Sequence, residues 1–102
     1  MSISESSEYS DVLQTSYIAA TLNVTTSQVH LKVGASPLTA RETLIIYNRG
    51  SQAIFVGPSG VNSTTGIRLT TNQMLTLNVG EAISVFAVTN SGNADVTVQE
   101  LA

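Results

Sequence analysis

Apolar and polar residues alternate along much of this chain, in short runs that turn residues separate. The clearest run is QVHLKV, residues 28–33, in which Val29, Leu31 and Val33 fall on one face of an extended segment and polar residues on the other. A period of two is typical of a β-strand with one buried face. Gly34 and Pro37 follow it, and the missing N–H of proline cannot extend a ladder of hydrogen bonds.

Further runs of aliphatic, β-branched and aromatic residues follow at close spacing. They are VLQTSYIA and TLNVT within residues 12–25, TLIIYN (43–48), AIFV (53–56), IRLT (67–70), MLTLNV (74–79), AISVFAV (82–88) and ADVTVQEL (94–101). In TLIIYN, AIFV and AISVFAV the apolar residues fall on both faces, which is typical of strands covered on both sides. In MLTLNV, Met74 lies on the face opposite the leucines.

This pattern predicts an all-β protein, because no segment repeats apolar residues at helical spacing over three turns. We expect a single antiparallel β-sandwich or jelly-roll-like barrel of about seven to eight short strands, spanning residues 12–102. Residues 1–11 are rich in serine and hold three of the seven acids. They are interpreted as a flexible, acidic N-terminal extended arm, either disordered or ordered only against a neighbouring subunit.

Composition narrows the function classes. Hydrophobic residues make up 42% of the chain, enough for a core, but charged residues make up only 11%, against about 25% in an average domain. The cations are Lys32, Arg41, Arg49 and Arg68, and the net charge is −3. Scattered cations do not form the basic cluster that nucleic acid requires, so we expect no nucleic-acid binding. No apolar run approaches the roughly 18 residues of a membrane span, so we expect no membrane insertion.

Candidate catalytic and metal-binding residues are scarce. His30 is the single histidine and there is no cysteine. A catalytic triad would need His30 held by an acid and touching a nucleophile, and no local motif supports that grouping. A zinc site needs three or four ligands, and the chain offers one histidine and seven dispersed acids. We expect His30 to be an ordinary exposed strand residue. A pair of catalytic carboxylates could come from Glu42, Glu81, Asp95 and Glu100, but such pairs need burial to separate their pKa values. The prediction is therefore no catalytic residue, no metal and no cofactor: the protein is not an enzyme.

Serine and threonine instead cover the strand ends and loops. Their short side chains lose little conformational entropy when a partner covers them, whereas lysine and glutamate each lose about 1.5–2 kcal/mol. A surface poor in lysine and glutamate is typical of protein–protein contact. The alternative is that this composition is merely common in β-rich proteins.

Several turn and strand markers, from about Leu22 onward, resemble small structural proteins of tailed bacteriophages. The markers are the turn Val33–Leu38 (VGASPL), the hairpin Asn48–Ser51 (NRGS), the strand Ile54–Gly57 (IFVG), the step Gly60-Val61, the glycine at Gly66 and the terminus Glu100–Ala102 (ELA). Where such proteins have a glycine before the MLTLNV-like strand, this chain has Asn72-Gln73. Asparagine tolerates positive φ better than most residues.

The resemblance implies a non-enzymatic virion protein, most naturally a decoration or cement protein that binds the major capsid protein on the capsid surface after synthesis in the host bacterial cytoplasm. A homo-oligomer, with a trimer favoured, would bridge capsid subunits. From composition we add Tyr9, Val12, Leu13 and Tyr17 as candidate capsid-docking residues. The alternatives are a tail or neck accessory protein and a carbohydrate-binding β-sandwich module.

Overall fold

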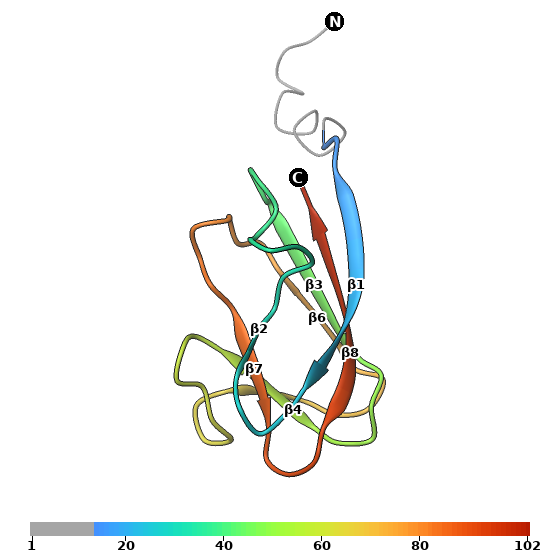
Figure 1. Ribbon diagram of the computed structural model, residues 1–102, viewed down its shortest axis with the longest axis vertical. Coiled ribbons are helices and arrows are strands. Elements are labelled where there is room, and N and C mark those ends of the chain that lie inside the picture. The colour runs from blue at the N-terminus through green and yellow to red at the C-terminus, as the bar shows by residue number, and fades with distance from the viewer. Residues whose placement is uncertain (1–13) are drawn as a thin grey trace, which may run out of the picture.

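A computed structural model describes residues 14–102, which form two four-stranded antiparallel sheets (Figure 1). The strands are β1 (Tyr17–Val24), β2 (Val29–His30), β3 (Thr43–Asn48), β4 (Ile54–Gly57), β5 (Ile67–Leu69), β6 (Met74–Leu77), β7 (Phe86–Thr89) and β8 (Ala94–Leu101). The first sheet has the order β1-β8-β3-β6 and the second the order β2-β7-β4-β5.

Strands pair in order from the two ends of the chain toward its middle. Strand β1 pairs with β8, β2 with β7, β3 with β6 and β4 with β5, all antiparallel, so the chain is in effect one long double-stranded hairpin. Two further pairings, β3 with β8 and β4 with β7, roll that hairpin into two facing sheets. Eight strands in two such sheets make a jelly roll. The predicted all-β sandwich is confirmed.

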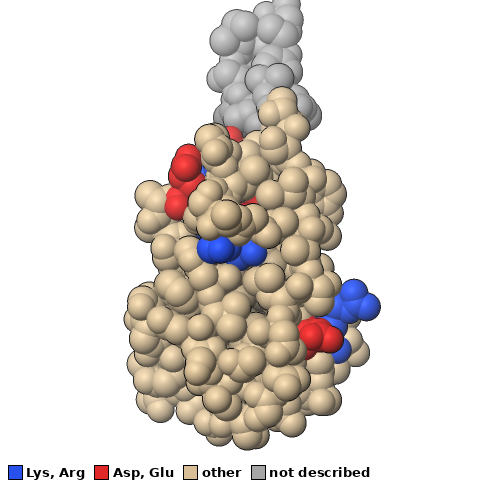
Figure 2. Space-filling model, in the orientation of Figure 1, with Lys and Arg blue, Asp and Glu red and all other residues tan. Residues whose placement is uncertain are grey.

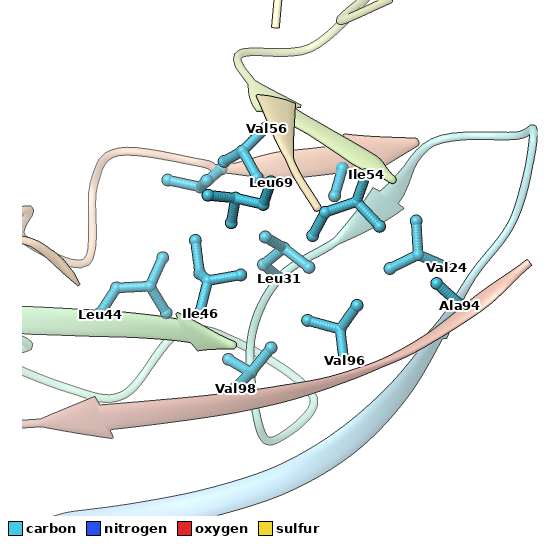
Figure 3. Close-up of a cluster of buried hydrophobic side chains, with 12 residues drawn as sticks. Val24, Leu31, Leu44, Ile46, Ile54, Val56, Leu69, Ala94, Val96 and Val98 are labelled. Carbon is cyan, nitrogen blue, oxygen red and sulfur yellow. The ribbon is translucent and has the colours of Figure 1, made fainter. Parts of the chain in front are cut away.

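The core fills the space between the sheets and is almost entirely aliphatic (Figure 3). Alternation along each strand supplies it, because successive side chains point to opposite faces. In β8, for example, Ala94, Val96 and Val98 are buried and the residues between them are not. The buried cluster comprises Val24, Leu31, Leu44, Ile46, Ile54, Val56, Leu69, Val85, Ala87, Ala94, Val96 and Val98.

Some predicted strands differ in length from the observed ones. TLIIYN is found with its predicted bounds as β3. The run at 28–33 keeps ladder geometry only over Val29–His30, although Leu31 points into the core and its N–H still donates to Val85 O. The described part of the 12–25 region is one strand, β1, rather than two.

Two asparagines hold the turns beside β3. The Asn48 side chain is buried, donates to the carbonyls of Gln52 and Leu69 and accepts from the Gly50 N–H, each at 2.9 Å. Both N–H groups of the amide and its oxygen are therefore hydrogen-bonded to backbone, which fixes the hairpin. Asn72 has a φ of 65°, which agrees with the expectation that asparagine replaces a glycine there.

Candidate functional site

In the second sheet, the chain's own loop between β4 and β5 covers the outer side of β4. Val61 of this loop is buried and packs against Gly57 and Gly66. A Cβ on Gly66 would lie 2.7 Å from Phe55 Cβ, so glycine is what lets the loop lie this close. Phe55, on the outward side of β4, is consequently buried. The prediction that AIFV is covered on both sides is correct.

The outer face of the first sheet has no such cover within the described residues. We call it the bare face. Cross-strand partners point to the same side of a sheet, so the register defines its members. They are Tyr17, Ala19, Thr21 and Asn23 of β1, Asp95, Thr97, Gln99 and Leu101 of β8, Thr43, Ile45 and Tyr47 of β3, and Met74 and Thr76 of β6.

The bare face is nearly uncharged and partly apolar. Asp95 is its one ionisable acid, and the Asn23 amide donates to it at 3.1 Å. Tyr17 and Met74, at 65% and 63%, are the two most exposed large hydrophobic side chains of the described residues. Figure 2 shows how few charged side chains the molecule presents, here on the side seen in Figure 1. A wide uncharged surface with exposed apolar side chains is typical of an interaction site.

Hydrogen bonds hold two of the large side chains of the bare face in place. The Tyr17 hydroxyl donates to Gln99 Oε1 at 2.7 Å, and the Tyr47 hydroxyl donates to Asn72 Oδ1 at 2.9 Å. Aromatic rings fixed in this way lose little further entropy when a partner covers them. The face is therefore already organised for contact.

The bare face also accounts for one departure from the sequence prediction. TLIIYN was predicted to be covered on both sides, but in the described chain only Leu44, Ile46 and Asn48 are buried. Ile45 and Tyr47 point outward and are only partly buried. The apolar residues on that side are those expected of a covered strand, and nothing in residues 14–102 covers them.

The predicted docking residues fall in two places. Tyr17 lies at the margin of the bare face, opposite Leu101, whereas Tyr9, Val12 and Leu13 lie outside the described residues. Sequence reasoning did not identify Ile45, Met74 and Leu101 as surface residues of one site. The alternation in MLTLNV and ADVTVQEL carried the signal for two of them, but the cross-strand register that joins them did not follow from sequence.

His30 is half-buried rather than fully exposed. Its ring stacks on Phe86, its partner across the β2–β7 pair, with centroids 4.8 Å apart. Burial lowers the His30 pKa, the nearby charges of Lys32 and Arg41 lower it further, and Glu100 partly opposes them. Among described atoms Nε2 is buried without a hydrogen-bond partner. Within residues 14–102, no carboxylate hydrogen-bonds to the ring in the way that an acid orients a catalytic histidine.

Glu100, one of the four acids considered for a carboxylate pair, is fully buried with Arg41. Their side chains meet at 2.9 Å, both with no exposed surface. Glu100 also accepts from the N–H groups of Val33 and Leu38. Arg41 donates to the carbonyls of three residues beyond β6, Val79, Gly80 and Ile83. These contacts tie the β2–β3 and β6–β7 connections to β8 at one end of the sandwich, which is a structural role.

A shallow depression of about 550 Å³ lies on the second sheet, β2-β7-β4-β5, near its β4–β5 edge. Hydroxyl and amide side chains dominate its lining, together with one cation and one ring: Ser51, Gln52, Ala53, Phe55, Ser63, Arg68, Asn90 and Ser91. Phe55 is 9% exposed, so it offers little ring surface to a ligand. Across residues 14–102, no three histidine, aspartate or glutamate side chains gather as metal ligands.

Comparisons with known proteins give no relative: no family model matches the chain, and no curated protein matches it. The resemblance to phage structural proteins therefore stays a prediction. Helices long and apolar enough to cross a membrane are absent from the described part of the chain.

Proposed function

We propose that this chain is a non-enzymatic structural protein of a tailed-bacteriophage virion, a head decoration protein that binds the major capsid protein through its bare face. The observation that carries the proposal is the uncovered, nearly uncharged outer face of the β1-β8-β3-β6 sheet. The turn markers that resemble those of phage proteins support a phage virion as the location. The jelly roll is an architecture that viral capsid domains also use.

The proposed mechanism is mechanical. A molecule seated across adjacent capsid subunits adds contact area that must be lost before those subunits separate. Binding to the assembled lattice and not to the dissociated state raises the stability of the lattice by mass action. Threonine side chains and tyrosine rings suit this role because they form contacts at low entropic cost. Many copies matter more than one tight contact, since interfaces of about 1,600 Å² range from weak to tight.

The acidic segment before β1 is the proposed second element of docking. Tyr9, Val12 and Leu13 would extend the contact that Tyr17 begins at the margin of the bare face. Removal of residues 1–11 should leave a folded domain, because the strands between Tyr17 and Leu101 complete two sheets with a packed core between them. The truncated chain should bind heads more weakly, and unchanged binding would remove the segment from the docking site.

The test is co-sedimentation with purified, undecorated phage heads. Ile45→Lys places a charge at the centre of the bare face and should abolish binding, because burying an unpaired charge costs several kcal/mol. Thr64→Lys is the matched control: Thr64 is exposed on the loop that covers β4 of the second sheet, and its variant should bind like wild type. Equal binding by both variants contradicts the proposed face, and no binding by the wild-type chain contradicts the proposed partner.

Location in the particle is tested by copy number. Head decoration requires copies in proportion to the major capsid protein, measured by quantitative gel densitometry of virions. A handful of copies would favour the alternative of a tail or neck accessory protein.

A carbohydrate-binding module is the second candidate, favoured by the hydroxyl- and amide-lined depression near Arg68. A glycan array would test it, with Arg68→Ala as the site variant. A specific glycan lost in that variant would promote this reading over capsid binding. The nearly buried ring of Phe55 argues against it, because sugar rings stack on exposed aromatic faces.

A further inference from the structure

The four edge strands of the two sheets differ greatly in length. The edges β2, β5 and β6 have two, three and four residues, whereas β1 has eight. Proteins protect sheet edges with short strands, charged side chains, prolines or bulges. Strand β1, YIAATLNV, has none of these, and its register with β8 is continuous from Tyr17 to Val24. In Figure 1, β1 runs along the margin of the fold.

The unpaired backbone groups of this edge follow from the ladder. Ser16 and Ala102 exchange two hydrogen bonds, N–H to O in both directions, at 2.9 Å. In an antiparallel pair such residues alternate with residues whose N–H and C=O point away. Tyr17, Ala19, Thr21 and Asn23 therefore direct both backbone groups outward. All four are exposed, and none of the loop and turn hydrogen bonds of the described chain reaches them.

We propose that β1 pairs with β1 of a second copy of this chain, antiparallel, about a two-fold axis at Ala20. This register sets Ala19 opposite Thr21 of the second copy, and Tyr17 opposite Asn23 of the second copy. It is the register in which all four outward-directed residues enter hydrogen-bonded pairs. The four-stranded β1-β8-β3-β6 sheet of each copy then joins that of the other copy to make one continuous eight-stranded sheet.

A second copy is the occupant that fits this edge best. Antiparallel pairing about a two-fold axis is self-complementary: one strand supplies the donors and acceptors that its copy lacks. The strand is uncharged, so two copies meet without like charges, although the chain carries a net charge of −3. The residues nearest the axis are small, and Ile18 and Leu22, half-buried at the open edge of the sandwich, would face each other across it.

Pairing through β1 also keeps the bare face free. Paired residues point to the same side, so the bare faces of both copies lie side by side on one doubled surface. The inference does not depend on the proposed capsid partner, because it concerns the purified chain alone.

The first experiment measures the mass of the purified chain by analytical ultracentrifugation from micromolar to millimolar concentration. We expect a concentration-dependent species of twice the 10.7 kDa chain mass. Thr21→Lys should weaken self-association about tenfold or more, because it brings like charges close together across the axis. Thr76→Lys is the matched control, since Thr76 is exposed on the same face but on the opposite edge strand β6, and its variant should associate like wild type.

The second experiment tests the register by disulfide trapping, which is clean because the natural chain has no cysteine. A mixture of Ala19→Cys and Thr21→Cys chains should cross-link, since residues opposite each other in a hydrogen-bonded pair have Cα atoms about 5.5 Å apart. Either variant alone should cross-link poorly, because Ala19 and Ala19 of the second copy are diagonal neighbours, about 7–8 Å apart.

Three results would overturn the inference: a monomer at every concentration, equal association by the Thr21 and Thr76 variants, or cross-linking by single variants as efficient as by the mixture. A trimer, the state favoured from sequence, would also overturn it and leave capsid binding untouched. Conversely, a β1-paired dimer that ignores phage heads would refute the proposed function and not this inference.

Discussion

Replacement of Glu100 by glutamine tests how one end of the jelly roll is held together. The carboxylate accepts from Val33 N–H at 2.9 Å, from Leu38 N–H at 3.2 Å and from Arg41 at 2.9 Å. A glutamine of the same size has one accepting oxygen, so its amide N–H₂ must face at least one of these donors. The substitution also leaves the guanidinium of Arg41 buried without an opposite charge.

The magnitude follows from that burial. Removal of one partner from a fully buried ion pair costs about 3–5 kcal/mol, whereas an exposed pair contributes about 0–1 kcal/mol. A domain of this size has a total stability of about 5–15 kcal/mol. Because about 1 kcal/mol shifts the melting temperature of a small domain by about 4–8 °C, Glu100→Gln should lower it by at least about 12 °C.

The assay is urea unfolding followed by circular dichroism, with thermal melting in parallel. Glu42→Gln is the matched control, since Glu42 is exposed and its carboxylate accepts a hydrogen bond from the Gln14 amide at 2.8 Å. The control should unfold within about 0.5 kcal/mol of wild type. A decrease in the free energy of unfolding of less than about 1 kcal/mol for Glu100→Gln would refute the reasoning, because a buried charge left unpaired costs more than that.

Three further outcomes are expected from the same structure. Gly50→Ala should destabilise the fold by about 1–3 kcal/mol, since its Cβ would lie 2.6 Å from Ala94 Cβ, whereas Gly34→Ala, with its nearest contact at 3.8 Å, should be close to neutral in urea unfolding. Ile46→Ala should cost about 2–5 kcal/mol in the same assay because Ile46 is fully buried. The His30 pKa is lowered in the folded state, so the unfolded chain binds a proton more readily and stability should fall as pH decreases through and below about 6.5. His30→Asn should reduce this dependence of melting temperature on pH, and an unchanged dependence would contradict the assignment.

Most of the fold could be predicted from local pattern because strand alternation reports burial directly. The run TLIIYN has apolar residues on both sides and turn residues after it, and it forms β3 with the predicted bounds. By contrast, AISVFAV begins its strand only at Phe86. The earlier residues belong to the connection that supplies Gly80 and Ile83 carbonyls to Arg41. Hydrogen bonds to the distant Arg41 guanidinium hold this connection outside the sheet, and the local sequence pattern does not show them.

The candidate site was less predictable for a related reason. Alternation shows which residues of β3 and β6 point outward, but it does not show that those strands lie next to each other. The bare face exists because β3 pairs with β6 and β8 while the β4–β5 loop covers β4 of the second sheet. The Arg41–Glu100 pair, 59 residues apart in sequence, is likewise a product of topology.

Met74 lies on the bare face and is a natural probe of whether that face binds protein. Met74 is 63% exposed at the start of β6, on the outward side of that strand, and methionine oxidation to the sulfoxide depends on access. The measurement is the rate of Met74 oxidation by hydrogen peroxide, read by mass spectrometry, for the free chain and for the chain bound to phage heads. We predict that binding slows the oxidation several-fold; an unchanged rate in a demonstrably bound chain would contradict the assignment of this face.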